Sequence, residues 1–101
     1  MLDGRTSSGK SPWLSLGRLL SPTITVEGLE AGGTVSVRVS NRSEDTPPTD
    51  SDDGAPHITL GNLTSDIGAG LGGAFTWVRV IKTAGGSPTP TYVIAQAQQA
   101  K

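Results

Sequence analysis

The sequence contains no cysteine and few aromatic residues: one Phe, one Tyr and two Trp. Without cysteine the chain has no disulfide, no thiolate metal site and no cysteine nucleophile. The small aromatic set predicts a thin core, and a chain of 101 residues buries only about two-thirds of the surface that it exposes when unfolded. These features argue against an enzyme with a large catalytic cleft.

Long apolar runs are also missing. No stretch approaches the roughly 20 apolar residues that cross a bilayer, and residues 1–20 hold no uninterrupted apolar segment of the kind found in signal peptides. We therefore expect a chain that is neither exported by a standard signal nor bound to a membrane.

Charge is close to balanced but unevenly placed. The net charge is −1, yet residues 43–54 hold five acids and no base, which leaves eight bases against four acids elsewhere. This asymmetry suits docking against charged neighbours, but the basic excess is too small for a dedicated nucleic-acid binder. The simplest interpretation of 43–54 is a solvated acidic loop.

Apolar residues recur at every second position in several segments, which is typical of strands with one buried face. Val35, Val37 and Val39 show the pattern most clearly, and residues 23–26 and 57–60 repeat it. Residues 75–81 carry apolar side chains on both faces, as a central strand does, and a Gly-Gly turn leads from them into 91–95. With 14 Gly, 7 Pro and about six such segments, the sequence predicts an all-β domain over 23–101, a β-sandwich or small barrel.

Residues 1–22 do not share this period and predict an extended N-terminal arm. Residues 1–11 are rich in Gly, Ser and charge, and an apolar patch follows before Pro22. A small sandwich has little room for five more large side chains, so we expect the patch to bind a partner, with tryptophan as a favoured anchor. The patch consists of Trp13, Leu14, Leu16, Leu19 and Leu20.

Residues 4–11 read GRTSSGKS and satisfy the phosphate-binding pattern G-x-x-x-x-G-K-[ST]. That motif works only where a buried strand enters the loop and a helix leaves it, so that backbone N–H groups converge on the phosphates. Here three residues precede Gly4, and Pro12 follows Ser11 directly. We interpret the match as coincidental and expect no nucleotide binding.

Metal and catalytic chemistry have no evident residues either. His57 is the single histidine, too few ligands for a zinc site. Asp50, Asp52 and Asp53 beside Gly54 lack the spacing and the bidentate Glu of a calcium loop, which leaves only an irregular Ca²⁺ site open. We therefore expect a non-enzymatic protein without a cofactor.

The order of the strands gives a resemblance. Residues 33–41 (GTVSVRVSN), a variable loop, residues 75–80 (FTWVRV) and a hairpin into 91–94 resemble the small β-sandwich modules of tailed-bacteriophage virion proteins. The chain differs from the commoner pattern after Asn41, where it has RSED in place of D-G-x-x-W. The resemblance covers 23–95.

This resemblance implies a virion structural protein made in the host cytoplasm, with a capsid decoration or cement protein on the major capsid protein as the leading role. A homo-oligomer within the assembly is expected, with no nucleic-acid partner. A head-tail connector or a tail component are the alternatives within the virion. A carbohydrate- or receptor-binding module using loop 41–56 is a further alternative, which that loop's lack of aromatic residues disfavours.

Overall fold

The computed structural model describes residues 1–16, 19–61, 67–70 and 75–99, and of 19–22, 67–70 and 96–99 it describes the backbone alone. These residues form strands and no helix, so the described part of the chain contains no helix able to cross a membrane. The strands are β1 (Leu2–Arg5), β2 (Gly9–Lys10), β3 (Leu14–Ser15), β4 (Leu19–Glu27), β5 (Thr34–Ser40), β6 (Ala55–Gly61), β7 (Ile67–Gly70), β8 (Trp77–Thr83) and β9 (Thr91–Gln99).

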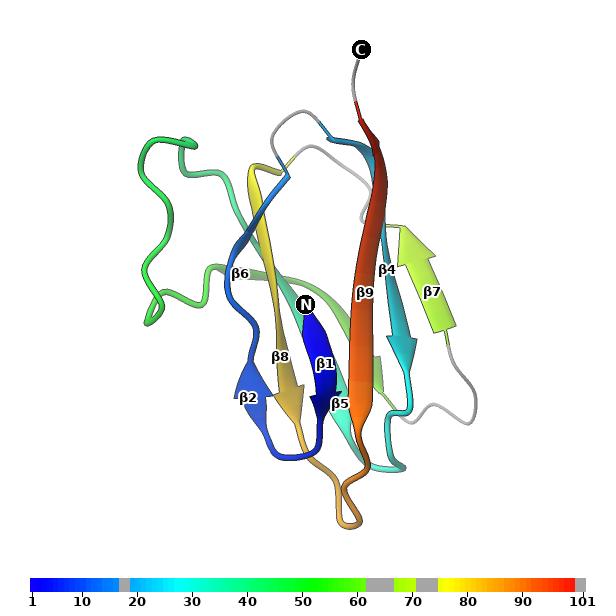
Figure 1. The fold of residues 1–101 in the computed structure, drawn as a ribbon. Helices are drawn as coiled ribbons and strands as arrows, with labels where there is room; N and C mark the ends of the chain where they lie inside the picture. The colour runs from blue at the N-terminus through cyan, green and yellow to red at the C-terminus, as the bar shows by residue number, and fades with distance from the viewer. Residues whose placement is uncertain (17–18, 62–66, 71–74, 100–101) are drawn as a thin grey trace.

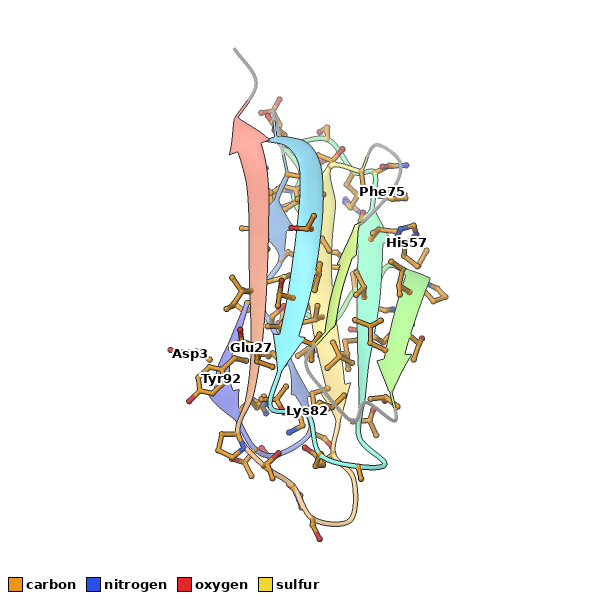
Figure 2. All side chains as sticks on the ribbon, turned by 90° about the vertical axis from the view of Figure 1, so that its right-hand side faces the viewer. Asp3, Glu27, His57, Phe75, Lys82 and Tyr92 are labelled. Carbon is orange, nitrogen blue, oxygen red and sulfur yellow. The ribbon has the colours of Figure 1, made fainter. Side chains whose placement is uncertain are left out.

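Two antiparallel sheets pack face to face, as Figures 1 and 2 show. The first has the order β1-β9-β4-β7, and the second has the order β2-β8-β5-β6. β3 pairs with the same edge of β8 as β2, but nearer the start of β8. The longest pairing joins β4 to β9, from Leu19 opposite Gln99 to Glu27 opposite Tyr92. The prediction of an all-β domain is confirmed, and of the two architectures that the sequence left open, sandwich and barrel, the structure has the sandwich.

The core lies between the sheets and follows the period-two pattern. Along β5, Val35, Val37 and Val39 are buried while the residues between them are half-exposed. Since successive side chains of a strand point to opposite faces, one face of β5 fills the core and the other faces outward. The buried apolar residues are Leu2, Leu16, Ile24, Val26, Val35, Val37, Val39, Leu60, Val78, Val80 and Val93.

β8 is the central strand of its sheet, as its apolar sequence predicts, with β5 on one side and β2 and β3 on the other. Val78 and Val80 face the core. Trp77 lies outside the core cluster: it is half-buried, and its Nε1 donates to Ser43 O at 3.3 Å. Its mid-strand position among Val and Ile in the sequence predicts a core residue, and this prediction is wrong, because alternation along β8 places Trp77 on the outward face.

Residues 1–22 differ most from the expected extended arm. β1 pairs with β9, β2 and β3 pair with β8, and β4 already begins at Leu19, so the expected boundary after residue 22 falls inside a strand. The physical reason is burial: Leu2 and Leu16 are core residues, which ties this segment to both sheets. The short strands β1, β2 and β3 also raise the number from about six to nine in the described chain.

Candidate functional site

An apolar groove opens along one side of the sandwich. Its volume is about 640 Å³, and residues 1–3, residues 12–14 and residues 92–95 of β9 line it. It therefore lies where β1 and β9 of one sheet approach the segment leading into β3 of the other. We refer to it as the groove.

Exposed apolar side chains of the described chain gather in the groove. Leu14, Tyr92 and Ile94 are 38, 42 and 41% exposed, and these three are the exposed large hydrophobics of the described residues. All three line the groove. Scattered exposed apolar residues are ordinary on a soluble protein, whereas their convergence on one hollow makes it a candidate interaction site.

Little charge enters the groove. Asp3 is the one charged side chain in its lining, and Figure 2 shows Asp3 beside Tyr92 on the outer side of the first sheet. Among the described residues no ion pair involves Asp3. A ligand here would meet apolar surface with one carboxylate at its margin.

The structure distributes the predicted apolar patch among three environments. Leu14 lies in the groove and Leu16 is buried in the core at 4% exposure. Trp13 also lines the groove, but it is half-buried. Leu19 and Leu20 pair through their backbones with Gln99 and Gln98, and their side chains lie outside what the structure describes. Of the expected partner-binding residues, the structure brings Trp13 and Leu14 together.

Trp13 anchors the acidic loop, residues 43–54, to the body of the protein. Its Nε1 donates to Thr49 O at 3.2 Å and to Asp52 O at 3.0 Å. Gly54 has φ +62°, and a Cβ at this position would meet Val39 O and the Trp13 ring, so both conformation and space favour glycine there. The tryptophan thus serves an intramolecular contact as well as lining the groove.

Arg79 holds the same loop from beneath. Its side chain is 0% exposed, Nη2 donates to Asp50 Oδ1 at 2.9 Å, and Nη1 lies 3.3 Å from Asp53 Oδ1. Nε donates to Ser11 O at 3.1 Å, and the guanidinium lies 4.9 Å from the centre of the Trp13 ring, a cation–π contact. A buried charge is tolerated only when it is paired and hydrogen-bonded, and the loop supplies those partners.

Two further cations contact the loop's end. Lys10 Nζ donates to Asp53 Oδ1 at 2.9 Å, and Arg38 Nε donates to Asp53 O at 2.9 Å. The hydrogen bond from Lys10 lowers the pKa of Asp53, and the charges of Lys10, Arg79 and Arg38 add to this against partial burial. Ion pairs and hydrogen bonds therefore hold the acidic loop against the outward face of the second sheet, so the loop is not fully solvated.

Lys82 forms a second buried ionic cluster, and its side chain lies between the two sheets (Figure 2). Its side chain is 0% exposed, and Nζ lies 2.9 Å from Glu30 Oε1. Nζ also donates to the carbonyl oxygens of Arg5, Thr6 and Thr89, each at 3.0 Å. One ammonium group thus joins the turn after β1 to the loops before β5 and before β9.

Glu30 accepts hydrogen bonds on both carboxylate oxygens. Gly85 N donates to Oε2 at 2.7 Å, and Thr89 N donates to Oε1 at 3.3 Å. Burial by itself would raise the pKa of Glu30, but the hydrogen bonds from Gly85, Lys82 and Thr89 outweigh it and lower the pKa from 4.5 to about 2. The Glu30 carboxylate and the Lys82 ammonium group thus hold the surrounding loops together through hydrogen bonds to their backbone groups.

The phosphate-binding pattern at 4–11 forms a turn between two strands. β1 ends at Arg5, β2 spans Gly9–Lys10, and no helix follows. The carbonyl oxygens of Arg5 and Thr6 face the Lys82 ammonium, and Arg5 donates to Ser7 O and Ser8 O. A phosphate site needs backbone N–H donors that point at the ligand, whereas this turn presents carbonyl oxygens that accept hydrogen bonds from cationic side chains.

The residues considered for metal binding are engaged elsewhere. The Asp50 and Asp53 carboxylates contact Arg79, and Asp52 Oδ1 accepts from Gly54 N. His57 packs edge-on against Phe75, with ring centres 4.8 Å apart. Within the described ranges, no group of three or more potential ligands comes together.

Comparison with models of known protein families, with curated proteins and with solved structures finds no match for the chain. The groove must therefore be interpreted from its own residues. Sequence reasoning missed Tyr92 and Ile94, although a signal was present. Residues 91–95 carry Val93 and Ala95 on one face and Tyr92 and Ile94 on the other, so two large apolar residues had to face away from the core.

Proposed function

We propose that this chain is a non-enzymatic structural protein of a bacteriophage virion and that it contacts protein neighbours through the groove. The leading role is a capsid decoration or cement protein on the major capsid protein, with a head-tail connector or tail component as the alternative position. The observation that carries the proposal is the convergence of Leu14, Tyr92 and Ile94 in one groove. The virion assignment draws on the sequence resemblance of residues 23–95.

The groove suits a protein neighbour energetically. Apolar and aromatic side chains that are fully desolvated on binding supply most of the free energy at protein interfaces, and charged residues are depleted from interface centres. The groove offers a leucine, an isoleucine and a tyrosine with one carboxylate at the margin. Covering it would remove the largest exposed apolar side chains of the described chain from water.

The proposal is tested by particle attachment. Purified phage particles lacking the protein are mixed with the wild-type chain, with Leu14→Asp or with Thr83→Asp, and sedimented. Thr83 is an exposed residue at the end of β8 and does not line the groove, so its variant adds the same charge elsewhere. We expect Leu14→Asp to weaken attachment by about 2 kcal/mol or more, and Thr83→Asp to attach as wild type. Equal attachment of all three, or none by the wild type, would contradict the proposal.

A carbohydrate site is a second candidate for the same groove. Sugar binding needs exposed aromatic faces beside polar groups, and the fold brings Tyr92, Trp13 and Asp3 together although no loop contains an aromatic cluster. Titration with neutral oligosaccharides followed by tryptophan fluorescence tests this alternative. Saturable binding that Tyr92→Ala abolishes would support it, and flat titrations would eliminate it for the sugars used.

A further inference from the structure

β9 is longer than the strand that covers its outer edge. β4 pairs along β9 up to Gln99 on one side, whereas β1 on the other side reaches only from Thr91 to Val93. In Figure 1 the upper half of β9 extends beyond the start of β1. None of the described strands pairs with that edge over 94–99, which leaves this side of β9 available to another strand in the described structure.

This edge carries none of the features that keep edge strands from pairing with other chains. Proteins protect such edges with charges, proline, bulges or very short strands. Residues 91–99 (TYVIAQAQQ) contain no charged residue, proline or glycine. The β4–β9 ladder shifts register between Leu20 and Thr23, opposite Gln96 to Gln98, but the extra residue of this bulge lies on β4 and not on β9. The edge is long and uncharged, and β9 itself carries no bulge over 94–99.

The other outer strands contrast with it. β6, at the edge of the second sheet, contains Pro56, and its register with β5 shifts between Val37 and Arg38. β7, at the far edge of the first sheet, has only four residues, two of them glycine. Protection is therefore present at these two edges and absent over 94–99.

We propose that a second copy of this chain occupies the open edge, with β9 pairing antiparallel to β9 of its partner. The proposal rests on the proposed function, because it names one protein neighbour of the groove. An antiparallel pair of identical strands is self-complementary about a two-fold axis, the symmetry of most homodimers. The two four-stranded sheets would then form one continuous sheet of eight strands.

Charge and the position of the groove favour a copy of the chain over an unrelated charged partner. Like charges opposite each other across paired strands are destabilising, and two uncharged β9 edges meet without that cost. Leu14 of β3 and Ile94 of β9 both line the groove beside this edge. A strand added at this edge would lie next to these exposed side chains in both copies.

The dimer is tested on the pure chain by sedimentation equilibrium between about 1 and 300 µM, the range in which a micromolar dimer dissociates. We expect a reversible monomer–dimer equilibrium for the wild type. The variant Gln96→Lys/Gln98→Lys places like charges on both strands near the two-fold axis and should weaken the dimer about a hundredfold. The control Ala55→Lys/Thr59→Lys adds the same charge at exposed positions of β6 and should dimerise as wild type.

A second variant keeps the test decisive. Gln96→Glu/Gln98→Glu should also be monomeric, and mixing it with the Lys variant should restore a dimer of one copy of each, since opposite charges then face each other. Circular dichroism confirms that each variant is folded. A monomeric wild type over the whole range, a dimer unaffected by the Lys pair, or failure of the two folded variants to associate would overturn the proposal.

The outcomes separate this proposal from the proposed function. A monomeric chain that still sediments with particles, and loses this with Leu14→Asp, overturns the dimer alone. A dimer that never sediments with particles overturns the virion assignment alone.

Discussion

Replacing Glu30 by glutamine should destabilise the protein more than any other single carboxylate-to-amide change in the described chain. The substitution leaves the buried Lys82 ammonium with three carbonyl oxygens and no counter-charge. Breaking one side of a buried ion pair costs about 3 to 5 kcal/mol, because an uncompensated charge remains. Against a typical domain stability of about 5 to 15 kcal/mol, such a loss is severe.

The magnitude can be checked independently from the pH dependence. The pKa of Glu30 falls from 4.5 to about 2 on folding, and each pKa unit corresponds to about 1.4 kcal/mol, so the ionised carboxylate contributes about 3 to 4 kcal/mol. A lowered carboxylate pKa stabilises the fold above the unfolded value. That contribution is complete above pH 4.5 and is lost as the pH falls toward 2.

The assay is urea unfolding of wild type and Glu30→Gln at several pH values between 7 and 2.5, followed by circular dichroism. The difference in unfolding free energy between the two proteins should be largest at pH 7 and should shrink below pH 4.5. Glu27→Gln is the control, because Glu27 is half-exposed and has no ion pair in the described structure. The double variant Glu30→Met/Lys82→Met should recover part of the loss, since neither charge remains. The recovery is incomplete because three carbonyl oxygens and two N–H groups lose their hydrogen-bond partners.

Two results would refute this reasoning. A Glu30→Gln variant as stable as Glu27→Gln at pH 7 would mean that the Glu30–Lys82 pair contributes nothing to the fold. A stability difference that stays constant from pH 7 to 2.5 would mean that the Glu30 pKa is not lowered.

Three further predictions concern the core, the acidic loop and the phosphate-like pattern. Val37→Asp places a charge in the core and should abolish cooperative thermal unfolding. Trp77→Ala removes a side chain from the outward face and should lower the unfolding free energy by only about 1 to 2 kcal/mol. If both variants lost the same stability, the β8 register would be wrong. Arg79→Met should release the acidic loop and speed proteolysis within 43–54 about tenfold or more, and an unchanged cleavage rate would show that Arg79 does not hold it. Calorimetry with Mg²⁺-ATP should show no binding, and Lys10→Ala should change the unfolding free energy by less than about 1 kcal/mol. Micromolar ATP binding that Lys10→Ala removes would contradict the interpretation of residues 4–11 as a turn between strands.

Alternation predicted the strands that build the core. The valines of β5 and the doubly apolar β8 needed no long-range information, because period two is a local property of an extended chain with one or two buried faces. The same reasoning fails for β2 and β3. Strands of two residues are too short to show any period, and they exist because β8 offers an edge to pair with.

The groove was only partly predictable. Leu14 and Trp13 stood out as apolar residues outside the strand pattern, but Leu16 shares that feature and is buried. Which of these side chains faces solvent depends on the pairing of residues 11–16 with β8, and nothing local in the sequence encodes it. The clasped acidic loop was missed for the same reason, since Arg79 lies far along the chain from Asp50 and Asp53.

Hydrogen–deuterium exchange tests the central claim, that the groove and the adjoining β9 edge form the protein-binding surface. The chain is compared as a dilute free protein and as a component bound to particles. We predict slower exchange on binding in peptides that cover 12–16 and 91–99, because covered groove residues and newly paired backbone amides both exclude solvent. Peptides covering the acidic loop, 43–54, should exchange at the same rate in both states. Protection confined to 43–54, or unchanged exchange over 91–99 in a chain that does bind, would contradict the account.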